Sequence, residues 1–390
     1  MLQLQVNRFQ AGSYIIVEGK EDNDHFYIIQ KGTVSCQKGA HQYYLGTGDF
    51  IGVVSCFANR PQTETAIAKT DVLAIAVKKS QYQELIVNNT PVALKIIKTF
   101  SNRMRQLNEE LTKITLHKAA IEDFEQIFHV GRYYEKQVQK DIAVFAYYQY
   151  LKTRPNSPNL PVAQDRFRAL KPQSHAVYFE PTSDMTRVYP KDTMIFSEAA
   201  PGAEMFIIQH GQVAISKIVN GNEVVLAVLG KGDMFGEMAL LENKPRSASA
   251  IAKTECGVMV VNRKNFNNMV STQPQLIVRL TTTLAERLWS MYRQLDNARI
   301  QDPLEKMVDI LSLQLEKQRT NFETLGSKQK QTDFTIKELA TMCALDEKLS
   351  AEGISRFYED KRFKIIEGKI FIKDITEVHK ASCYARKHLQ

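Results

Sequence analysis

Short hydrophobic runs recur near the N-terminus and again after the middle of the chain. Residues 26–32 (FYIIQKG) and 72–77 (VLAIAV) have counterparts at 205–211 (MFIIQHG) and 258–263 (VMVVNR), and residues 14–19 (YIIVEG) form a further run of this kind. These runs are rich in Ile, Val, Phe and Tyr and lie close to Gly, Asp or Asn, which predicts strands joined by turns. Asn220-Gly221 adds a two-residue hairpin signal. Several short strands with close turns predict two small antiparallel barrels of the jelly-roll type.

A heptad pattern follows each group of strands. The first seam consists of Ile97, Phe100, Met104, Leu107, Leu111 and Ile114, and the second of Ile277, Leu284, Leu288, Met291, Leu295 and Ala298. This spacing predicts two long helices that each pair with another helix. The alternative is that each seam packs on its own barrel. Pairing within one chain and pairing between two chains of a homodimer both fit the pattern.

The strand-rich regions are two copies of one domain. The sequence AIAKT at 66–70 recurs at 250–254, YLGTGDFIG at 44–52 resembles VLGKGDMFG at 228–236, and FYIIQKGTV at 26–34 resembles MFIIQHGQV at 205–213. Repeats of this length indicate two copies of a domain rather than a solenoid. Residues 117–175, which separate them, match the spacing of one tetratricopeptide repeat through Gly131, Tyr134, Ala143, Tyr147, Tyr150 and Pro155. One such repeat predicts a helical hairpin that acts as a spacer or a docking surface.

The last segment predicts a helix-turn-helix followed by a β-hairpin around Glu367-Gly368, which is the order of a winged helix. The expected fold is therefore α+β, with two jelly-roll barrels, a long helix after each, a helical-hairpin linker and a C-terminal winged helix. The expected domains are a degenerate barrel at 1–116, the linker at 117–180, the second barrel at 181–300 and the winged helix at 301–390.

Composition and charge restrict the function. The chain has 390 residues, 44% hydrophobic and 24% charged, with no apolar run that predicts a signal peptide or a membrane helix. Five scattered cysteines, without a CxxC pair, argue against a disulfide framework or a zinc site. The expectation is a cytoplasmic protein with no catalytic constellation, no metal site and no cofactor, and hence not an enzyme. The net charge of +8 is not clustered.

The second copy contains a charged pair that suits a ribose phosphate. In FGEMALLENKPRSASA, Gly236 allows close backbone approach, Glu237 can accept hydrogen bonds from sugar hydroxyls, and Arg246 offers a fork of donors to phosphate. Ser247 adds a hydroxyl beside the Arg. Taken alone, the same residues also fit a surface salt bridge between Glu237 and Arg246.

This stretch resembles the phosphate-binding cassette of the cyclic nucleotide-binding domain family, which includes the catabolite activators and the regulatory subunits of cyclic-nucleotide-dependent kinases. The family pattern is present as Phe235-Gly236-Glu237, Ala239-Leu240 and Pro245-Arg246-Ser247-Ala248. The resemblance implies that Glu237 binds the ribose 2′-hydroxyl and Arg246 the cyclic phosphate of cAMP or cGMP. Backbone N–H groups around Gly236, Met238, Ala239 and Ser247 complete the implied pocket.

The first copy lacks this pair, because Val53 and Gln62 stand at the matching positions. A Gln cannot neutralise a phosphate, and loss of a charged hydrogen bond costs about 1.5–3 kcal/mol. The first barrel is therefore expected to be a structural or interaction domain, and the alternative is that it holds a different, uncharged ligand.

In the family, the helix after the barrel also covers the base. Met291 and Tyr292 stand where the catabolite activators keep a pair of hydroxyl residues, so the chain departs from that pattern. The resemblance implies instead that Tyr292 or Trp289 stacks on the purine. The choice between adenine and guanine stays open, because Ser247 suits either the phosphate or a guanine.

The winged helix resembles the DNA-binding domain of the catabolite activators. This implies DNA contacts from Lys348 and Ser350 on its second helix and from a basic group around the hairpin. The group comprises Lys361, Arg362, Lys364, Lys369 and Lys373. Leu349 and Gly353 depart from the activator pattern, Gly353 at a position that matches a base-reading Arg.

The charge of the C-terminal segment keeps two outputs open. Residues 301–390 contain 16 Lys and Arg against 15 Asp and Glu, a net charge of only +1. We therefore predict a cyclic nucleotide sensor that regulates transcription through DNA. The alternative is a sensor that acts on a protein partner through the linker, the first barrel or the C-terminal segment.

Overall fold

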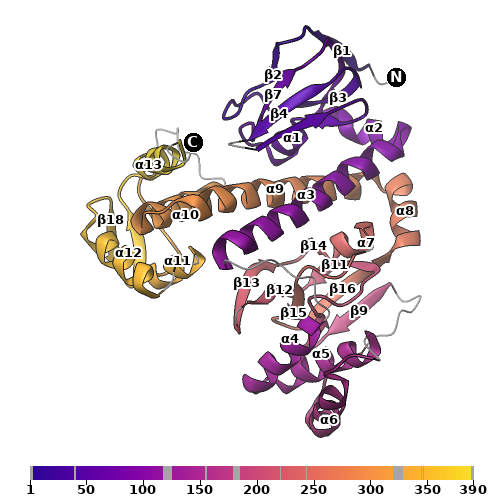
Figure 1. The fold of residues 1–390 in the computed structure, drawn as a ribbon, viewed down its shortest axis with the longest axis vertical. Coiled ribbons are helices and arrows are strands. Elements are labelled where there is room, and N and C mark those ends of the chain that lie inside the picture. The colour runs from indigo at the N-terminus through magenta and orange to yellow at the C-terminus, as the bar shows by residue number, and fades with distance from the viewer. Residues whose placement is uncertain are drawn as a thin grey trace. The chain divides into compact units, whose positions relative to one another are not determined.

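The computed structural model describes residues 3–38, 41–116, 125–153, 156–178, 185–219, 221–242, 244–318, 328–343, 345 and 347–387. They form two compact units, each assembled from separate stretches of the chain (Figure 1). Unit 1 comprises Met1–Gln81, Gln106–Ala120 and Ala285–Gln390, and unit 2 comprises Tyr82–Arg105 and Ile121–Leu284.

The first barrel, in unit 1, is a pair of four-stranded antiparallel sheets. Its strands are β1 (Gln5–Phe9), β2 (Tyr14–Ile16), β3 (His25–Lys31), β4 (Val34–Lys38), β5 (His41–Leu45), β6 (Phe50–Ile51), β7 (Thr65–Ala68) and β8 (Val72–Lys78). The sheet orders are β1-β8-β3-β6 and β2-β7-β4-β5. Alternating side chains from both sheets fill the space between them, among them Ile15, Ile29 and Ala66. A short helix, α1 (Val53–Ala58), follows β6.

The second barrel, in unit 2, repeats this topology. Its strands are β9 (Thr186–Tyr189), β10 (Met194–Phe196), β11 (Glu204–His210), β12 (Val213–Val219), β13 (Asn222–Leu229), β14 (Met234–Phe235), β15 (Ser249–Ala252) and β16 (Cys256–Asn262). The orders β14-β11-β16-β9 and β10-β15-β12-β13 correspond strand for strand to those of the first barrel. The predicted duplication is therefore confirmed as two copies of one topology. In the β12–β13 hairpin, Asn220 lies outside the described residues, and Gly221 has a φ of 75°.

Two long helices, α3 (Thr90–Leu116) and α9 (Pro274–Arg299), follow the barrels after the shorter α2 (Tyr82–Asn88) and α8 (Arg263–Thr272). Both long helices pass from one unit into the other. Arg299 on α9 forms an ion pair of 2.8 Å with Glu110 on α3, so the two helices meet within one chain. Association of two chains stays a prediction.

The linker forms three helices, α4 (Glu125–Lys136), α5 (Lys140–Thr153) and α6 (Leu160–Leu170), of which the sequence predicted the first two as a hairpin. The absence of a side chain at Gly131 allows α4 to approach α5, because a Cβ there would lie only 2.8 Å from the ring of Tyr147. The helices share a core with Met194, Ile218 and Ile251 of the second barrel.

The C-terminal elements belong to unit 1. They are α10 (Pro303–Lys317), β17 (Lys330–Gln331), α11 (Ile336–Met342), α12 (Glu347–Glu359), β18 (Phe363–Ile366), β19 (Lys369–Ile372) and α13 (Ile375–Lys387). Thr335 begins α11 with a capping box formed with Glu338. Glu367 and Gly368 have φ values of 51° and 76°, which a two-residue hairpin turn requires. The sequence analysis did not predict α13.

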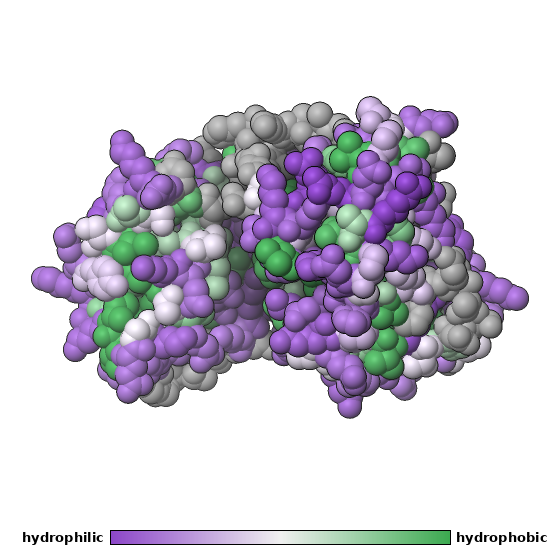
Figure 2. Space-filling model, turned by 90° about the horizontal axis from the view of Figure 1, so that it is seen from below, coloured by the Kyte–Doolittle hydropathy of each residue, from purple (hydrophilic) through white to green (hydrophobic). Residues whose placement is uncertain are grey.

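Most of the surface drawn in Figure 2 is hydrophilic, and its apolar residues form small separate groups. Among the described helices, none combines the length and the apolar character needed to cross a bilayer.

Candidate functional site

The charged pair of the second barrel lies around the turn between β14 and α7 (Glu237–Glu242). Gly236 makes this turn with a φ of 78°, in the left-handed region that favours glycine. Arg246 follows α7 in the chain and lies beside the same turn, where its Nη1 donates to the carbonyl of Gly236 over 2.7 Å. Glu237 begins the helix and is buried, with 3% of its surface exposed.

Arg246 is a buried cation. Only 6% of its surface is exposed, and its guanidinium carbon lies 4.1 Å from the ring centroid of Phe196. Its Nε is buried and has no hydrogen-bond acceptor among the described residues. Burial lowers the pKa of Arg246 to about 10, although the carboxylates of Glu204 and Glu237 oppose the shift. A buried guanidinium with a free donor is the chemistry that binds an oxyanion.

Residues that the sequence analysis did not single out hold Arg246 in place. Its backbone pairs with Ala199 and Ala200, since Arg246 N donates to the carbonyl of Ala200 over 2.8 Å and the carbonyl of Arg246 accepts from Ala199 N over 2.9 Å. Gly202 leaves room for the guanidinium, because a Cβ there would lie 2.2 Å from Arg246 Nε. Glu204 is fixed by a bidentate ion pair with Arg187, with both N–O distances at 2.9 Å.

The remaining predicted residues of the cassette lie beside this pair. Met238 and Ala239 are buried in the first turn of α7, where backbone N–H groups have no partner within the helix. Ser247 is half-buried, and its hydroxyl contacts Met238 Sδ at 3.7 Å. The structure thus brings the six predicted residues of the cassette together at the turn before α7, the first turn of α7 and the loop before β15.

The aromatic residues that were expected to cover the base of the second barrel's ligand contact the first barrel. Trp289 and Tyr292 are buried on the part of α9 that belongs to unit 1, and their rings contact cations of the first barrel. Arg60 lies 4.5 Å from the ring of Trp289, and Lys38 lies 4.0 Å from that of Tyr292. Met291 is half-buried on the same part of the helix. The assignment of the three residues to the second barrel rested on the order of the chain and stays a prediction, whereas the two ring contacts described here are with the first barrel.

Within unit 2, the helix α3 lies next to the cassette. Arg105 on this helix is buried, and its Nη2 lies 3.5 Å from the carbonyl of Pro245, the residue before Arg246. Ser101, one turn earlier, has a buried hydroxyl without a hydrogen-bond partner among the described residues. Sequence reasoning missed both residues, because they precede the second copy and belong to no motif.

The first barrel has the same backbone framework with different side chains. Gly52 has a φ of 72°, α1 begins at Val53, and Gln62 lies beside the turn as Arg246 does in the second barrel. Gln62 Nε2 donates to the carbonyl of Asp22, and its Oε1 is buried without a partner among the described residues. The matching of Val53 with Glu237 and of Gln62 with Arg246 therefore holds in three dimensions.

Polar residues of the first barrel bond to one another around this turn. Lys38 Nζ donates to the carbonyl of Thr63 over 2.9 Å, and Tyr43 donates to the carboxylate of Glu64. Arg60 Nη2 donates to the carbonyl of Glu316 on α10 over 2.6 Å. The region around the first turn is thus tied to α9 and α10 by protein contacts.

The residues that were expected to contact DNA differ in their exposure and in the protein groups that they contact. Lys348, in the first turn of α12, and Lys361 are exposed, and Ser350 is half-buried. Arg362 is paired with Asp360, with Nε at 3.0 Å from both carboxylate oxygens, and Lys369 donates to the carbonyl of Asp333.

The position of Gly353 does not agree with the alignment of α12 to the activator pattern. It was matched to a base-reading Arg, but it is buried, and a Cβ there would lie 2.9 Å from Met307 Sδ. Gly353 packs α12 on α10, so this position is not on the exposed face of the helix.

No metal site is expected from the sequence. In the described part of the chain, Asp22, Asp24 and His25 bring three potential ligand atoms within 4.8 Å of one another near the surface.

Comparison with known proteins agrees with the two copies. A model of the cyclic nucleotide-binding domain matches residues 6–89 and 186–273. A cAMP-dependent protein kinase regulatory subunit from Debaryomyces hansenii is 26% identical over 265 residues, which cover 67% of this chain and 44% of that protein. A cyclic AMP receptor protein from Thermus thermophilus is 32% identical over 111 residues, which cover 28% of this chain and 51% of that protein.

The chain spans about half the length of these curated relatives. Among solved structures, the catabolite activator protein of Thermus thermophilus aligns with 51% of this chain and 90% of its own, at 23% identity and a TM-score of 0.29. The repeated barrels, the cassette and the two matches of the domain model together identify two cyclic nucleotide-binding domains in this chain.

Proposed function

We propose that the second barrel binds cAMP or cGMP and that the chain is a sensor of this nucleotide. The observation that carries the proposal is the buried Arg246 guanidinium, held at the Gly236 turn beside the buried Glu237. Arg246 binds the cyclic phosphate, and Glu237 accepts a hydrogen bond from the ribose 2′-hydroxyl. Backbone N–H groups of Met238, Ala239 and Ser247 complete the site. The names of both curated relatives, a cAMP-dependent kinase regulatory subunit and a cyclic AMP receptor, support this ligand class.

The base is covered by residues of α3 in this proposal. Arg105 lies next to Pro245, and Ser101 supplies a buried hydroxyl on the same helix. The first barrel binds no cyclic nucleotide, because Val53 cannot accept a hydrogen bond from the ribose and Gln62 carries no charge.

Calorimetric titration of the intact chain tests the ligand and the number of sites. We expect one site per chain with cAMP or cGMP, since only one barrel carries the charged pair. Binding of two nucleotides per chain would contradict the assignment of Val53 and Gln62. The absence of binding heat with either nucleotide, at several temperatures so that an accidental zero enthalpy is excluded, would overturn the proposal.

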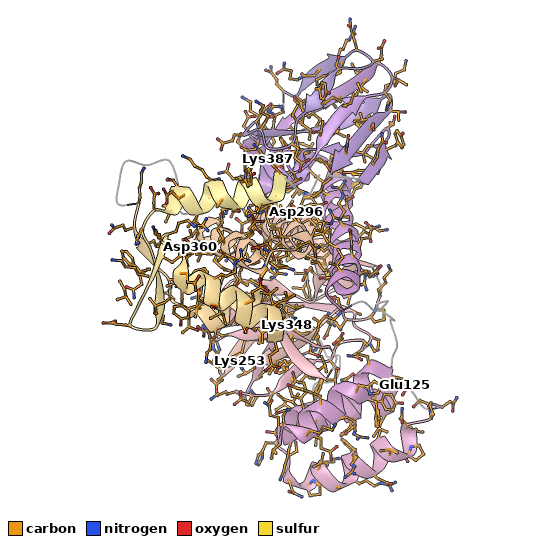
Figure 3. All side chains as sticks on the ribbon, turned by 60° about the vertical axis from the view of Figure 1, so that its left-hand side comes forward. Glu125, Lys253, Asp296, Lys348, Asp360 and Lys387 are labelled. Carbon is orange, nitrogen blue, oxygen red and sulfur yellow. The ribbon has the colours of Figure 1, made fainter. Side chains whose placement is uncertain are left out.

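For the output, we infer that α10–α13 and their sheet form a winged helix that binds DNA. The order of α11, α12 and the β18–β19 hairpin supports this assignment, as does the exposure of Lys348 and Lys361. Figure 3 shows Lys348 and Asp360 at opposite ends of α12. The continuous helix α9 carries the signal, because its first part belongs to the unit of the second barrel and its last part to the unit of the winged helix.

A second candidate output is a protein partner. Exposed carboxylates at Glu347 and Glu352 lie on α12 beside Lys348, and they repel phosphates at short range. Arg362 is neutralised by Asp360, which removes a cation that DNA binding would use. The similarity to a kinase regulatory subunit also supports a protein target.

A mobility-shift assay with a pool of random-sequence duplexes separates the two outputs. DNA binding predicts a nucleotide-dependent shift whose affinity falls steeply with salt, because counterions are released from the backbone. Replacing Lys348 and Lys361 with alanine weakens this shift, whereas the control Lys380→Ala, on the exposed face of α13, leaves it unchanged. No shift at low salt, with and without nucleotide, would exclude DNA and favour the protein partner.

A further inference from the structure

A thiol, an imidazole, a carboxylate and a guanidinium meet between α13 and α10, in the unit that does not contain the nucleotide cassette. Cys383 Sγ lies 3.7 Å from His379 Nε2, and the other ring nitrogen of His379 lies 3.5 Å from Glu316 Oε1. Arg386 Nη2 lies 3.3 Å from the same sulfur. The helix α13, which ends at Lys387, packs on α10 (Figure 3). The proposed function uses none of these four side chains.

This environment favours a thiolate. The hydrogen bond to His379 is the main reason that the pKa of the Cys383 thiol falls to about 7, and Arg386 lowers it further. The hydrogen bonds to Cys383 and Glu316 raise the pKa of His379 to about 9. Between these two pH values the pair is a thiolate and an imidazolium. A thiolate, rather than a thiol, is the nucleophile in cysteine chemistry.

The other four cysteines provide an internal contrast. Cys36, Cys56, Cys256 and Cys343 are buried, whereas Cys383 is half-buried. Burial raises the pKa of Cys56 and of Cys343 to about 12, and that of Cys256 also rises. His379, the partner of Cys383, exposes 36% of its side chain, so small reagents have access to the pair.

We propose that Cys383 is a reactive thiol that hydroperoxides oxidise to a sulfenic acid. The thiolate sulfur attacks the terminal oxygen of ROOH, so that an S–O bond forms while the O–O bond breaks. The electron pair leaves on the RO oxygen, which takes the proton of the His379 imidazolium to give ROH. Sulfur loses two electrons and the peroxide gains them. Arg386 stabilises the negative charge on the departing oxygen.

Oxidation of Cys383 affects α9 through the contacts of Glu316. The same carboxylate, Glu316, bonds to His379 through one oxygen and to Arg293 on α9 through the other, at 2.5 Å. Conversion of the thiolate to a neutral sulfenic acid removes the anion that His379 faces. The imidazole of His379 is then protonated in a smaller fraction of molecules, and its ion pair with Glu316 weakens.

Alkylation of the native chain with iodoacetamide, mapped by mass spectrometry, tests the reactivity of each cysteine. At pH 7 we expect Cys383 to react fastest and to titrate with an apparent pKa near 7. In His379→Gln the thiol returns toward the ordinary value of 9.0, so the thiolate fraction at pH 7 falls from about half to about one in a hundred. The more basic thiolate is about eightfold more nucleophilic, so the net slowing is about sixfold. The control Lys380→Gln, on the same helix, leaves rate and pH profile unchanged.

Treatment with hydrogen peroxide, followed by dimedone, then tests the oxidation itself. The dimedone adduct is expected on Cys383 in the native chain and to be lost in Cys383→Ser, with the rates of the other four cysteines unchanged. Circular dichroism checks that the variants are folded. Alkylation of Cys383 no faster than of the buried cysteines, a pH profile that His379→Gln does not move, or a dimedone adduct absent from Cys383 would overturn the proposal.

Discussion

Replacing Arg246 with glutamine is expected to weaken binding of the cyclic nucleotide at least about 100-fold. In the proposed site the guanidinium supplies two or more charged hydrogen bonds to the phosphate, each of about 1.5–3 kcal/mol, and about 1.4 kcal/mol corresponds to a tenfold change in affinity. Glutamine is the appropriate substitution because the first barrel already contains Gln62 at the matching position. The barrel topology is therefore compatible with this side chain.

Calorimetry of Arg246→Gln beside Gln62→Ala measures this effect with a matched control. Gln62 stands at the same place in the other barrel, so its replacement is expected to leave affinity and stoichiometry unchanged. Thermal unfolding of both variants confirms that the barrels are intact. Affinity within a factor of five of the unsubstituted chain in Arg246→Gln would show that Arg246 does not bind the phosphate.

Replacing Arg293 with methionine is expected to lower the free energy of unfolding of unit 1 by about 3–5 kcal/mol. Arg293 is buried on α9 and pairs with Asp309 at 3.1 Å and with Glu316, both on α10 and both buried. Removing one partner of a buried ion pair leaves the other charge without compensation. Asp309 keeps hydrogen bonds from Ser382 and Asn297 and an ion pair of 3.5 Å with Arg386, and Glu316 keeps His379. These remaining partners place the loss toward the lower end of this range.

Urea unfolding followed by the fluorescence of Trp289 measures this loss. Trp289 is the single tryptophan of the chain, and Arg293 lies 5.7 Å from its ring, so the signal reports on unit 1. Arg356→Ala is the control, since its ion pair with Asp302 is partly exposed and is expected to contribute less than about 1 kcal/mol. A loss in Arg293→Met no larger than in the control would mean that the buried pairs are not needed for stability.

The contacts of Glu316 with Arg293 and His379 predict that the protein becomes less stable in acid. Burial by itself raises the pKa of Glu316, but hydrogen bonds from His379 and Arg293 outweigh it and hold the value at about 2. Because the folded-state pKa lies below the ordinary value of 4.5, the stabilisation from Glu316 is complete above that pH. It is lost as the pH falls from there toward 2.

Local sequence was enough to predict the cassette. Gly236, Glu237 and Arg246 lie within eleven residues, and their relation depends on one turn, one short helix and the loop that follows it. The absence of the charged pair from the first copy, which has Val53 and Gln62 at these positions, could be predicted for the same reason. Gly202 and Glu204 could not be assigned this way, because their role depends on strand β11 and the loop before it lying beside Arg246, a pairing across the barrel that no spacing encodes.

By itself, the sequence determined that the chain has two barrels of one topology, that one of them keeps the charged pair, and that a helix with an apolar seam follows each. A heptad pattern states which face of a helix is buried, because the side-chain spacing is local, but it does not state what covers that face. Only the tertiary structure decided that Trp289 and Tyr292 contact the first barrel and that Arg105 lies beside the cassette of the second. It likewise brought Cys383, His379 and Glu316 together, since contacts between distant segments follow from how helices pack and not from their order along the chain.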